Sequence, residues 1–492
     1  MTDQPAEPDA TEAGGLTQRL GIPPGLGATA IGTGLASFLV LGSWYVLKPI
    51  RDEIASNYRD SVDLLWTAVF FAMLVASPLF AVLAKFLSRR QLATAVYGFL
   101  SAGTFGFSLI LERPELEHHL PWFPAADPAA DPESLGMLGR LGAFEAGEGA
   151  RFAGLFYVWC STYTLFVVSL FWSFATDIFK TRAAKSLFGP IAAAGTLGGI
   201  GSSLVMVNLA DDVDVTKLLL APALMLLGAL ACLLWTDSSR AGVAAGTQGS
   251  AADVANRSKI GGGILQGLLV VFRSPYLLSI CGYMLLASTI GSFLYQQQSE
   301  IVGAAIEERG ERRAFLAIIN LAINIGTLFS QLFLTAWLLK RVGIGLTLSA
   351  VPLTAAIGFT VLGTSQVQGV DPAVLLWIFV PVTVFWGLTR YSFSKPTKEL
   401  LFTLVPRDQK YRSKNFIDTA VYRGGDMLGY HLATALFTGF WVIPALPMWA
   451  LAYVAVPIAL AMLIVAQLLG RRATRRQAAG AAAPALSGAA SR

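Results

Sequence analysis

Charged residues are scarce in this sequence, where Asp, Glu, Lys and Arg make up only 14% of 492 residues, against about 25% in soluble domains. Apolar residues account for 54%, and the mean hydropathy is +0.60. This balance excludes an ordinary soluble domain and indicates an integral membrane protein. Basic residues exceed acidic ones by only 36 − 31 = 5 and form no basic tract, so we expect no nucleic acid partner.

Cysteine is also rare, and all three cysteines, Cys160, Cys232 and Cys281, lie within apolar runs. None has the C-x-x-C spacing of a metal or redox site, so the sequence indicates neither zinc nor a disulfide framework. It also lacks a phosphate-binding loop, a nucleophile elbow and an H-E-x-x-H helix. We therefore expect no enzyme activity, no metal and no cofactor, and transport would be driven by exchange or by an ion gradient.

Apolar runs of about 20 residues, the length that crosses about 30 Å of hydrocarbon, occur six times within 28–236 and six times within 264–470. A polar Gly/Ala/Ser-rich linker, residues 237–263, separates the two sets. Two six-helix halves joined in this way are the layout of the major facilitator fold. We therefore expect an all-α membrane protein of this fold, with twelve transmembrane helices in two bundles.

The segments outside the spans are polar or acidic. We expect a disordered cytoplasmic tail at 1–27, a long outer loop at 112–150, and a basic, then Ala-rich, tail at 471–492. The outer loop holds eight acidic and two basic residues, whereas basic residues gather at the other ends of the spans. Because basic loops stay in the cytoplasm, we predict that both termini are cytoplasmic. One such chain can form a complete pathway, so we expect a monomer in a lipid bilayer.

Ionisable residues inside a span cost roughly 2.5 to 3.5 kcal/mol each at the helix centre, so they need partners or a polar cavity. The first span ends with Lys48, Arg51 and Asp52 around Pro49, and helical spacing places the charges on one face. We predict that Lys48 and Arg51 form a cationic clamp for substrate. The alternative is a helix end whose long side chains reach the outer interface.

The tenth span repeats this pattern, because Lys395-Pro396-Thr397-Lys398-Glu399 has the same order of Lys, Pro, any residue, cation and anion. Arg390 adds a cation to the same stripe, and Lys395 and Glu399 are spaced for an i,i+4 pair. By the orientation above, the two copies lie toward opposite sides of the membrane. This predicts one charged element for each gate; the alternative is structural pairing near the inner interface.

Polar residues on other spans complete the candidate site. Asp418, Arg423 and Asp426 interrupt the apolar eleventh span, a glutamine run closes the seventh, and the small-residue stretch 189–201 favours close helix packing. The predicted substrate-binding residues are Lys48, Arg51, Gln296, Gln297, Arg390, Lys395, Lys398 and Arg423. The predicted gating or coupling residues are Asp52, Asp177, Glu399, Asp418 and Asp426.

Three stretches resemble a known family: WYVLKPIRDEIA at 44–55, FWSFATDIFKTRAAKSLFGPIAAAGTLGGIG at 171–201, and residues 395–429, which include KYRSKNFIDTAVYRGGDMLG. They are similar to the nucleotide transporters, or ATP/ADP translocases, of plastids and intracellular bacteria, and to their bacterial relatives in the major facilitator superfamily. The resemblance implies nucleotide binding, exchange of ATP for ADP, and a place in a bacterial inner membrane. It also implies that Arg51 and Asp52 match the cation and Asp of that family's first span.

Two positions depart from the family pattern. Where nucleotide-exchanging members carry a glutamate near the end of the seventh span, this chain has Gln296 or Gln297, and where they carry a lysine it has Asp426. The second change replaces a positive charge with a negative one. The leading hypothesis is a secondary transporter that exchanges an anionic solute, a nucleotide or another phosphorylated molecule. The alternatives are proton-coupled transport of a different solute and, ranked lower, a membrane scaffold or sensor without transport.

Overall fold

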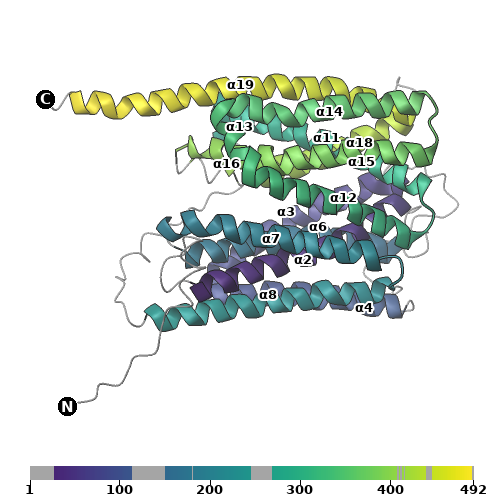
Figure 1. Ribbon diagram of the computed structural model, residues 1–492, viewed down its shortest axis with the longest axis horizontal. Coiled ribbons are helices and arrows are strands. Elements are labelled where there is room, and N and C mark those ends of the chain that lie inside the picture. The colour runs from purple at the N-terminus through teal and green to yellow at the C-terminus, as the bar shows by residue number, and fades with distance from the viewer. Residues whose placement is uncertain are drawn as a thin grey trace, which may run out of the picture.

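The computed structural model describes residues 27–113, 150–179, 181–244, 269–406, 409, 413–414, 416–438 and 446–489. The expected N-terminal tail, apart from residue 27, most of the outer loop and most of the linker lie outside the described residues. Long helices dominate the described part, and they run side by side along one axis (Figure 1). We use "outer side" for the end at which the first helix finishes, in keeping with the predicted orientation.

The first half consists of six long helices that begin and end close to the predicted span limits. Ser88 begins the third of them with a capping box, in which its hydroxyl accepts from the Gln91 N–H and its own N–H donates to the Gln91 side chain. The short turn η1 (Arg59–Ser61) joins the first two. The helices are α2 (Gly27–Asn57), α3 (Val62–Phe86), α4 (Arg89–Glu112), α6 (Ala150–Ile178), α7 (Thr181–Leu209) and α8 (Val215–Ala244).

The second half has the same number of spans, but three of them contain π-helical turns. Ser274 and Asp371 cap two of its helices, each followed by a proline at the first helical position. The elements are α11 (Pro275–Ala305), α12 (Arg309–Phe329), η3 (Ser330–Leu334), α13 (Thr335–Arg341), α14 (Gly343–Val367), α15 (Pro372–Thr389), η4 (Arg390–Ser394), α16 (Lys395–Thr403), η5 (Ile417–Val421), α18 (Tyr422–Thr438) and α19 (Met448–Ala489).

Eleven helices in the described part of the chain are long and apolar enough to cross a membrane. The remaining predicted span, residues 416–442, corresponds to η5 and α18, and its last residues lie outside the described part. Helix α2 begins, and α19 ends, at the same end of the bundle (Figure 1). These observations confirm the all-α membrane architecture that the hydropathy pattern predicts.

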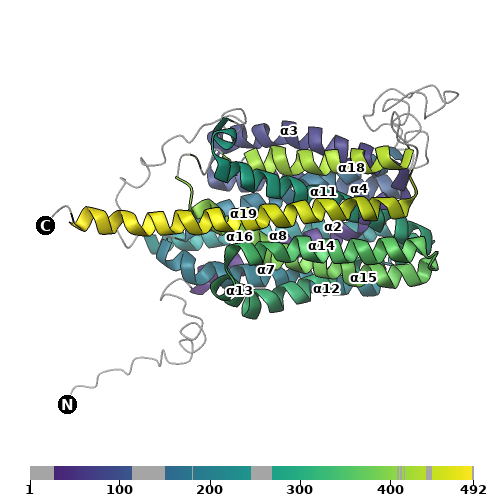
Figure 2. The ribbon, with the colours of Figure 1, turned by 90° about the horizontal axis from the view of Figure 1, so that it is seen from above.

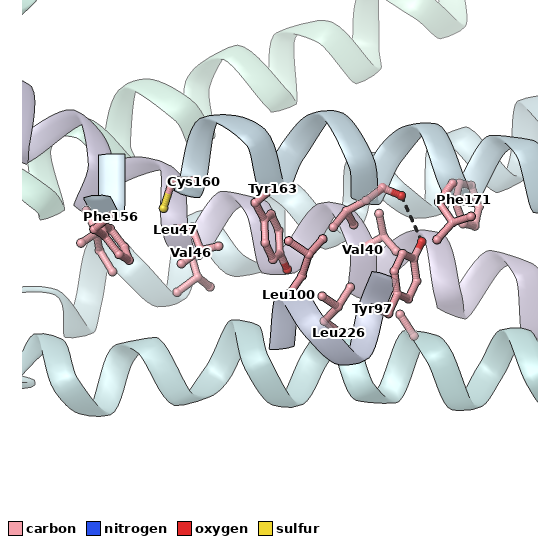
Figure 3. Close-up of a cluster of buried hydrophobic side chains, with 14 of the residues drawn as sticks. Val40, Val46, Leu47, Tyr97, Leu100, Phe156, Cys160, Tyr163, Phe171 and Leu226 are labelled. Carbon is pink, nitrogen blue, oxygen red and sulfur yellow. Dashed lines mark hydrogen bonds between the residues drawn. The ribbon is translucent and has the colours of Figure 1, made fainter. Parts of the chain in front are cut away.

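Buried side chains form two hydrophobic cores, one for each half. The first contains residues from 30 to 233 and also takes in Ala317 and Tyr430 of the second half; the other spans 271–473. Figure 3 shows part of the first core, in which the Tyr97 hydroxyl donates to the Val167 carbonyl at 3.0 Å. Because both groups are buried, this bond prevents an unsatisfied polar atom in the bundle.

Helices α3 and α18, from different halves, lie side by side, as do α7 and α12 (Figures 1 and 2). Within the first half, α2 and α7 approach closely at Gly198, where an added Cβ would overlap the carbonyl oxygen of Phe38 and lie 2.9 Å from its Cα. Close helix packing by the stretch 189–201 is therefore confirmed at this position.

We expect Gly198→Ala to destabilise the protein by about 1 to 3 kcal/mol, because the methyl group would meet backbone atoms that cannot rotate away. Gly201→Ala on the same helix is the matched control, since its Cβ would come no closer than 3.8 Å to Phe38. That control should be neutral or stabilising by up to about 1 kcal/mol. Thermal unfolding of the detergent-solubilised protein measures both, and equal unfolding temperatures would contradict the packing account.

Candidate functional site

The charged end of α2 is largely neutralised within the protein. Both Nε and Nη2 of Arg51 donate to Asp52 Oδ1, at 3.0 and 2.6 Å. The Tyr295 hydroxyl, from the second half, donates to the same oxygen at 2.9 Å, and Lys48 Nζ lies 3.6 Å from Asp52 Oδ2. Asp52 therefore has two cations and a hydroxyl as partners, which meets the cost of placing a carboxylate where it is 2% exposed.

Aromatic rings surround the guanidinium of Arg51. Its Cζ lies 5.2 Å from the ring centroid of Trp44, 5.6 Å from that of Tyr157, 5.8 Å from that of Tyr295 and 6.0 Å from that of Trp66. Such contacts stabilise a desolvated cation by up to about 2 kcal/mol. Arg51 is thus enclosed and already paired, whereas the side chain of Lys48 is 22% exposed.

A second group of cations lies on η4 and the start of α16. The Lys395 N–H donates to the Arg390 carbonyl, a five-residue step that inserts one extra residue into the turn. The Thr335 hydroxyl is 3.0 Å from both the Ser330 and the Ser392 carbonyl oxygens, so it ties the π turns η3 and η4 together. Lys395 is consequently placed eight residues, about 12 Å of helix, before its span ends at Thr403.

Rings, and not carboxylates, are the close partners of these two cations. Lys395 Nζ lies 4.2 Å from the ring centroid of Tyr391, and Arg390 Cζ lies 4.7 Å from that of Trp386 and 5.5 Å from that of Tyr422. Among the described residues, neither cation has an ion-pair partner. Lys395 is nevertheless exposed, so its ammonium group is accessible within a membrane-spanning segment.

Helix α18 adds a third charged group beside the second. Arg423 Nη1 lies 3.2 Å from Asp426 Oδ2, and its Cζ lies 5.5 Å from the ring centroid of Tyr422, which it shares with Arg390. Asp426 is 7% exposed, and it is also within electrostatic reach of Arg390 and Arg51. The eleventh span therefore contributes one cation and one anion to the same region.

We name these residues together the central cluster: Lys48, Arg51, Asp52, Arg390, Lys395, Arg423 and Asp426. Five are cations and two are anions, so the formal charge is 5 − 2 = +3. Because hydrophobic helices surround the cluster, this excess is only weakly screened. The arrangement is therefore suited to attract and hold a small anion, with aromatic faces beside the cations.

Asparagines on α12 were missed by the sequence reasoning. Lys48 Nζ donates to the side-chain oxygen of Asn320, and Tyr45 faces Asn324 one turn further along the helix. Asn324 is 5% exposed, and its Nδ2 has no hydrogen-bond partner among the described residues. Two Asn residues with i,i+4 spacing in an apolar helix are the signal that could have found this polar face.

Several predicted site residues lie outside the central cluster. Lys398 pairs with Asp418 at 2.8 Å, and Glu399 pairs with Lys414 at 2.6 Å. The expected Lys395–Glu399 pair is therefore wrong, because Lys395 turns toward Tyr391, four residues before it. The Asp177 side chain lies outside the described residues.

The two predicted glutamines are engaged at the outer ends of helices. Gln296 Nε2 donates to the Arg59 carbonyl and to Glu300, each at 3.3 Å. Gln297 Nε2 donates to the Met448 carbonyl at 3.2 Å and accepts from Gln366 at 2.7 Å. These contacts join helix ends, so both glutamines support the packing of the outer side in this conformation.

Ion pairs and hydrogen bonds join the two halves on the outer side. Arg309 Nε lies 2.7 Å from Glu53 Oε1, and the Glu53 side chain is only 2% exposed. Arg59 Nε lies 3.6 Å from Glu300 Oε2, and the hydroxyls of Tyr157 and Tyr295 are 3.1 Å apart. Together with the Tyr295–Asp52 bond, these contacts hold the outer ends of the halves closed against each other.

Three solved structures illustrate the folds that this chain is similar to. They are the nucleoside transporter NupG (TM-score 0.57, covering 90% of this chain and 98% of that one), the POT family transporter PepTSo (0.58, 91% and 98%), and the xylose transporter XylE from E. coli in an inward open conformation (0.53, 88% and 94%). Each is 12% identical to this chain. The chain therefore has the fold of the major facilitator superfamily, as the span pattern predicts.

No protein-family model and no curated protein matches the sequence. The resemblance to ATP/ADP translocases thus has no support from these comparisons beyond the shared fold.

Breaking the Glu53–Arg309 pair should destabilise the protein more than breaking the exposed Glu399–Lys414 pair. Arg309→Gln leaves a buried carboxylate with fewer cations, although Arg309 itself is half exposed, so we expect a coupling energy of about 1 to 3 kcal/mol from a double-mutant cycle with Glu53→Gln. The same cycle on Glu399 and Lys414 should give about 0 to 1 kcal/mol. Equal coupling energies in unfolding titrations would argue against a buried outer contact.

Proposed function

We propose that this protein is a secondary transporter that moves a small anionic solute by alternating access. The observation that carries the proposal is the net charge of +3 in the central cluster, with Arg390 and Lys395 resting on aromatic rings. Cations without carboxylate partners in a low-dielectric setting favour an anion strongly. The major facilitator fold supports a transport function, because its two halves enclose a site near the bilayer midplane.

The outer contacts indicate how the solute would reach the cluster. Glu53, Asp52 and Tyr157 all have partners in the second half on the outer side, so entry in this conformation would be from the inner side. Lys395 is exposed and would meet the anion first. Lys48, which contacts both Asp52 and Asn320, would join the bound anion to the outer contacts.

The chemical class of the solute follows from the available donors. Guanidinium groups bind carboxylate and phosphate oxygens through two parallel hydrogen bonds, and the cluster offers Arg390 and Arg423 beside Tyr422. A mono- or dianion would balance the excess of +3 without overcompensating it greatly. Nucleotides enter the test panel because of the sequence resemblance, next to smaller phosphates and carboxylates.

A second candidate function is proton-coupled transport of another solute. It is favoured by Asp426, a membrane-embedded carboxylate that is 7% exposed and has one ion-pair partner, Arg423. An acid in such a place can bind a proton on one side of the membrane and release it on the other. Asp426→Asn would then abolish uptake driven by a proton gradient but leave exchange of internal for external solute intact.

The direct test is uptake of labelled anions into proteoliposomes, with and without unlabelled anion inside and with and without a proton gradient. Uptake that needs internal anion supports exchange, and uptake that needs only the proton gradient supports coupling to protons. Failure of every anion in both formats, in protein shown to be folded, would contradict the anion proposal.

We expect Arg390→Gln or Lys395→Gln to lower kcat/KM for anion uptake by about tenfold to a hundredfold, because a hydrogen bond to a charged group contributes about 1.5 to 3 kcal/mol. Lys340→Gln is the matched control, since Lys340 is exposed at the end of α13 and far along the chain from the cluster. Equal losses in all three variants would show that the effect is not specific to the cluster.

A further inference from the structure

A carboxylate at the start of α3 is completely buried between the two halves. The Asp63 side chain has no exposed surface, and Nδ1 of His431, from α18 of the other half, lies 3.5 Å from its Oδ2. The other ring nitrogen, Nε2, is 2.7 Å from the Thr67 hydroxyl oxygen. His431 therefore contacts two side chains of α3, and both of its ring nitrogens are in use.

The hydrogen bonds determine where the protons lie. The Thr67 hydroxyl donates its single proton to the Asp63 carbonyl oxygen at 2.7 Å, so toward His431 it can only accept, and Nε2 must carry a proton. An ionised carboxylate also only accepts, so Nδ1 facing Asp63 carries a proton as well. The arrangement therefore fits the imidazolium form of His431, paired with the buried negative charge of Asp63.

The other titratable groups on elements packed against α18 have partners of their own. On α11, Tyr295 donates to Asp52 and Glu300 lies beside Arg59, while Tyr276 and Tyr283 donate to backbone carbonyls. On η5, Asp418 pairs with Lys398, and on α19 the Tyr453 hydroxyl meets Thr364. On α18 itself, Asp426 pairs with Arg423 and Tyr430 stacks on Trp66.

The pair has a defined place in the conformational cycle. Helices α3 and α18 belong to different halves, and Asp63 lies at the outer end of α3. Opening of the outer side would separate the two helices there, hydrate Asp63 and leave His431 without its anion. The outer-closed state thus binds the proton more tightly than the outer-open state, and by linkage the proton stabilises closure.

We infer that Asp63 and His431 form a proton-binding site that holds the outer side of the protein closed, so that acid favours closure and a rise in pH releases it. Imidazole is the side chain whose charge ordinarily changes between about pH 5 and about pH 8. His431 is 35% exposed, which gives protons access to the site. This inference goes beyond the proposed transport function and needs no solute to be tested.

The test measures the outer opening directly by spin labels on cysteines placed at Asn57 and Glu308, after the three native cysteines have been replaced. Both positions are exposed on the outer side, at the end of α2 and just before α12. In otherwise wild-type protein, the ratio of outer-open to outer-closed molecules should rise roughly tenfold from about pH 5.5 to about pH 8.5, the equivalent of about 1.4 kcal/mol.

Two substitutions of the same residue separate charge from packing. His431→Gln cannot gain a proton, so the ratio should be high and independent of pH. His431→Lys stays charged, so the ratio should be low and equally independent of pH. A ratio that does not change with pH in the wild-type protein would overturn the inference, and so would an unchanged pH dependence in His431→Gln. Asp63→Asn, expected to match His431→Gln, provides the second variant if one of them fails to fold.

Discussion

The cost of burying charge in hydrocarbon is the constraint on which the arrangement of this protein depends. Three acids of the first half, Asp52, Glu53 and Asp63, have side chains with at most 2% of their surface exposed. Each is satisfied in part by a residue of the second half: Tyr295, Arg309 and His431, respectively. Closing the outer side therefore completes the first half electrostatically, and opening it requires that water take over the same role.

The fold could be predicted largely from the sequence, because length and hydropathy decide which segments cross a membrane. The charged stripes of the first and tenth spans were also found, since an ionisable residue in an apolar run is conspicuous. Their partners were harder to predict. Glu53 and Arg309 are 256 residues apart, and no local pattern in one sequence pairs residues at that distance.

One local prediction was wrong for a physical reason. Lys395 and Glu399 have i,i+4 spacing, but side chains of an α-helix lean toward its N-terminus. Lys395 therefore reaches back to the ring of Tyr391, and Glu399 is left free to meet Lys414. The π turn η4 just before Lys395 added to the difficulty, because the extra residue changes which side chains share a face. Hydropathy carries no signal for such a turn.

The two halves differ in how their charges are balanced, and this difference bears on the proposed cycle. Acids of the first half are satisfied by protein groups across the outer contact, whereas Arg390 and Lys395 of the second half have only rings nearby among the described residues. Under the proposed function, a bound anion would supply the missing negative charge. Substrate binding would then lower the cost of holding these cations while Lys48 and the outer contacts rearrange. A fold that leaves part of its charge balance to the solute cannot complete that rearrangement equally well when empty, which is the property that ties solute movement to the change of state.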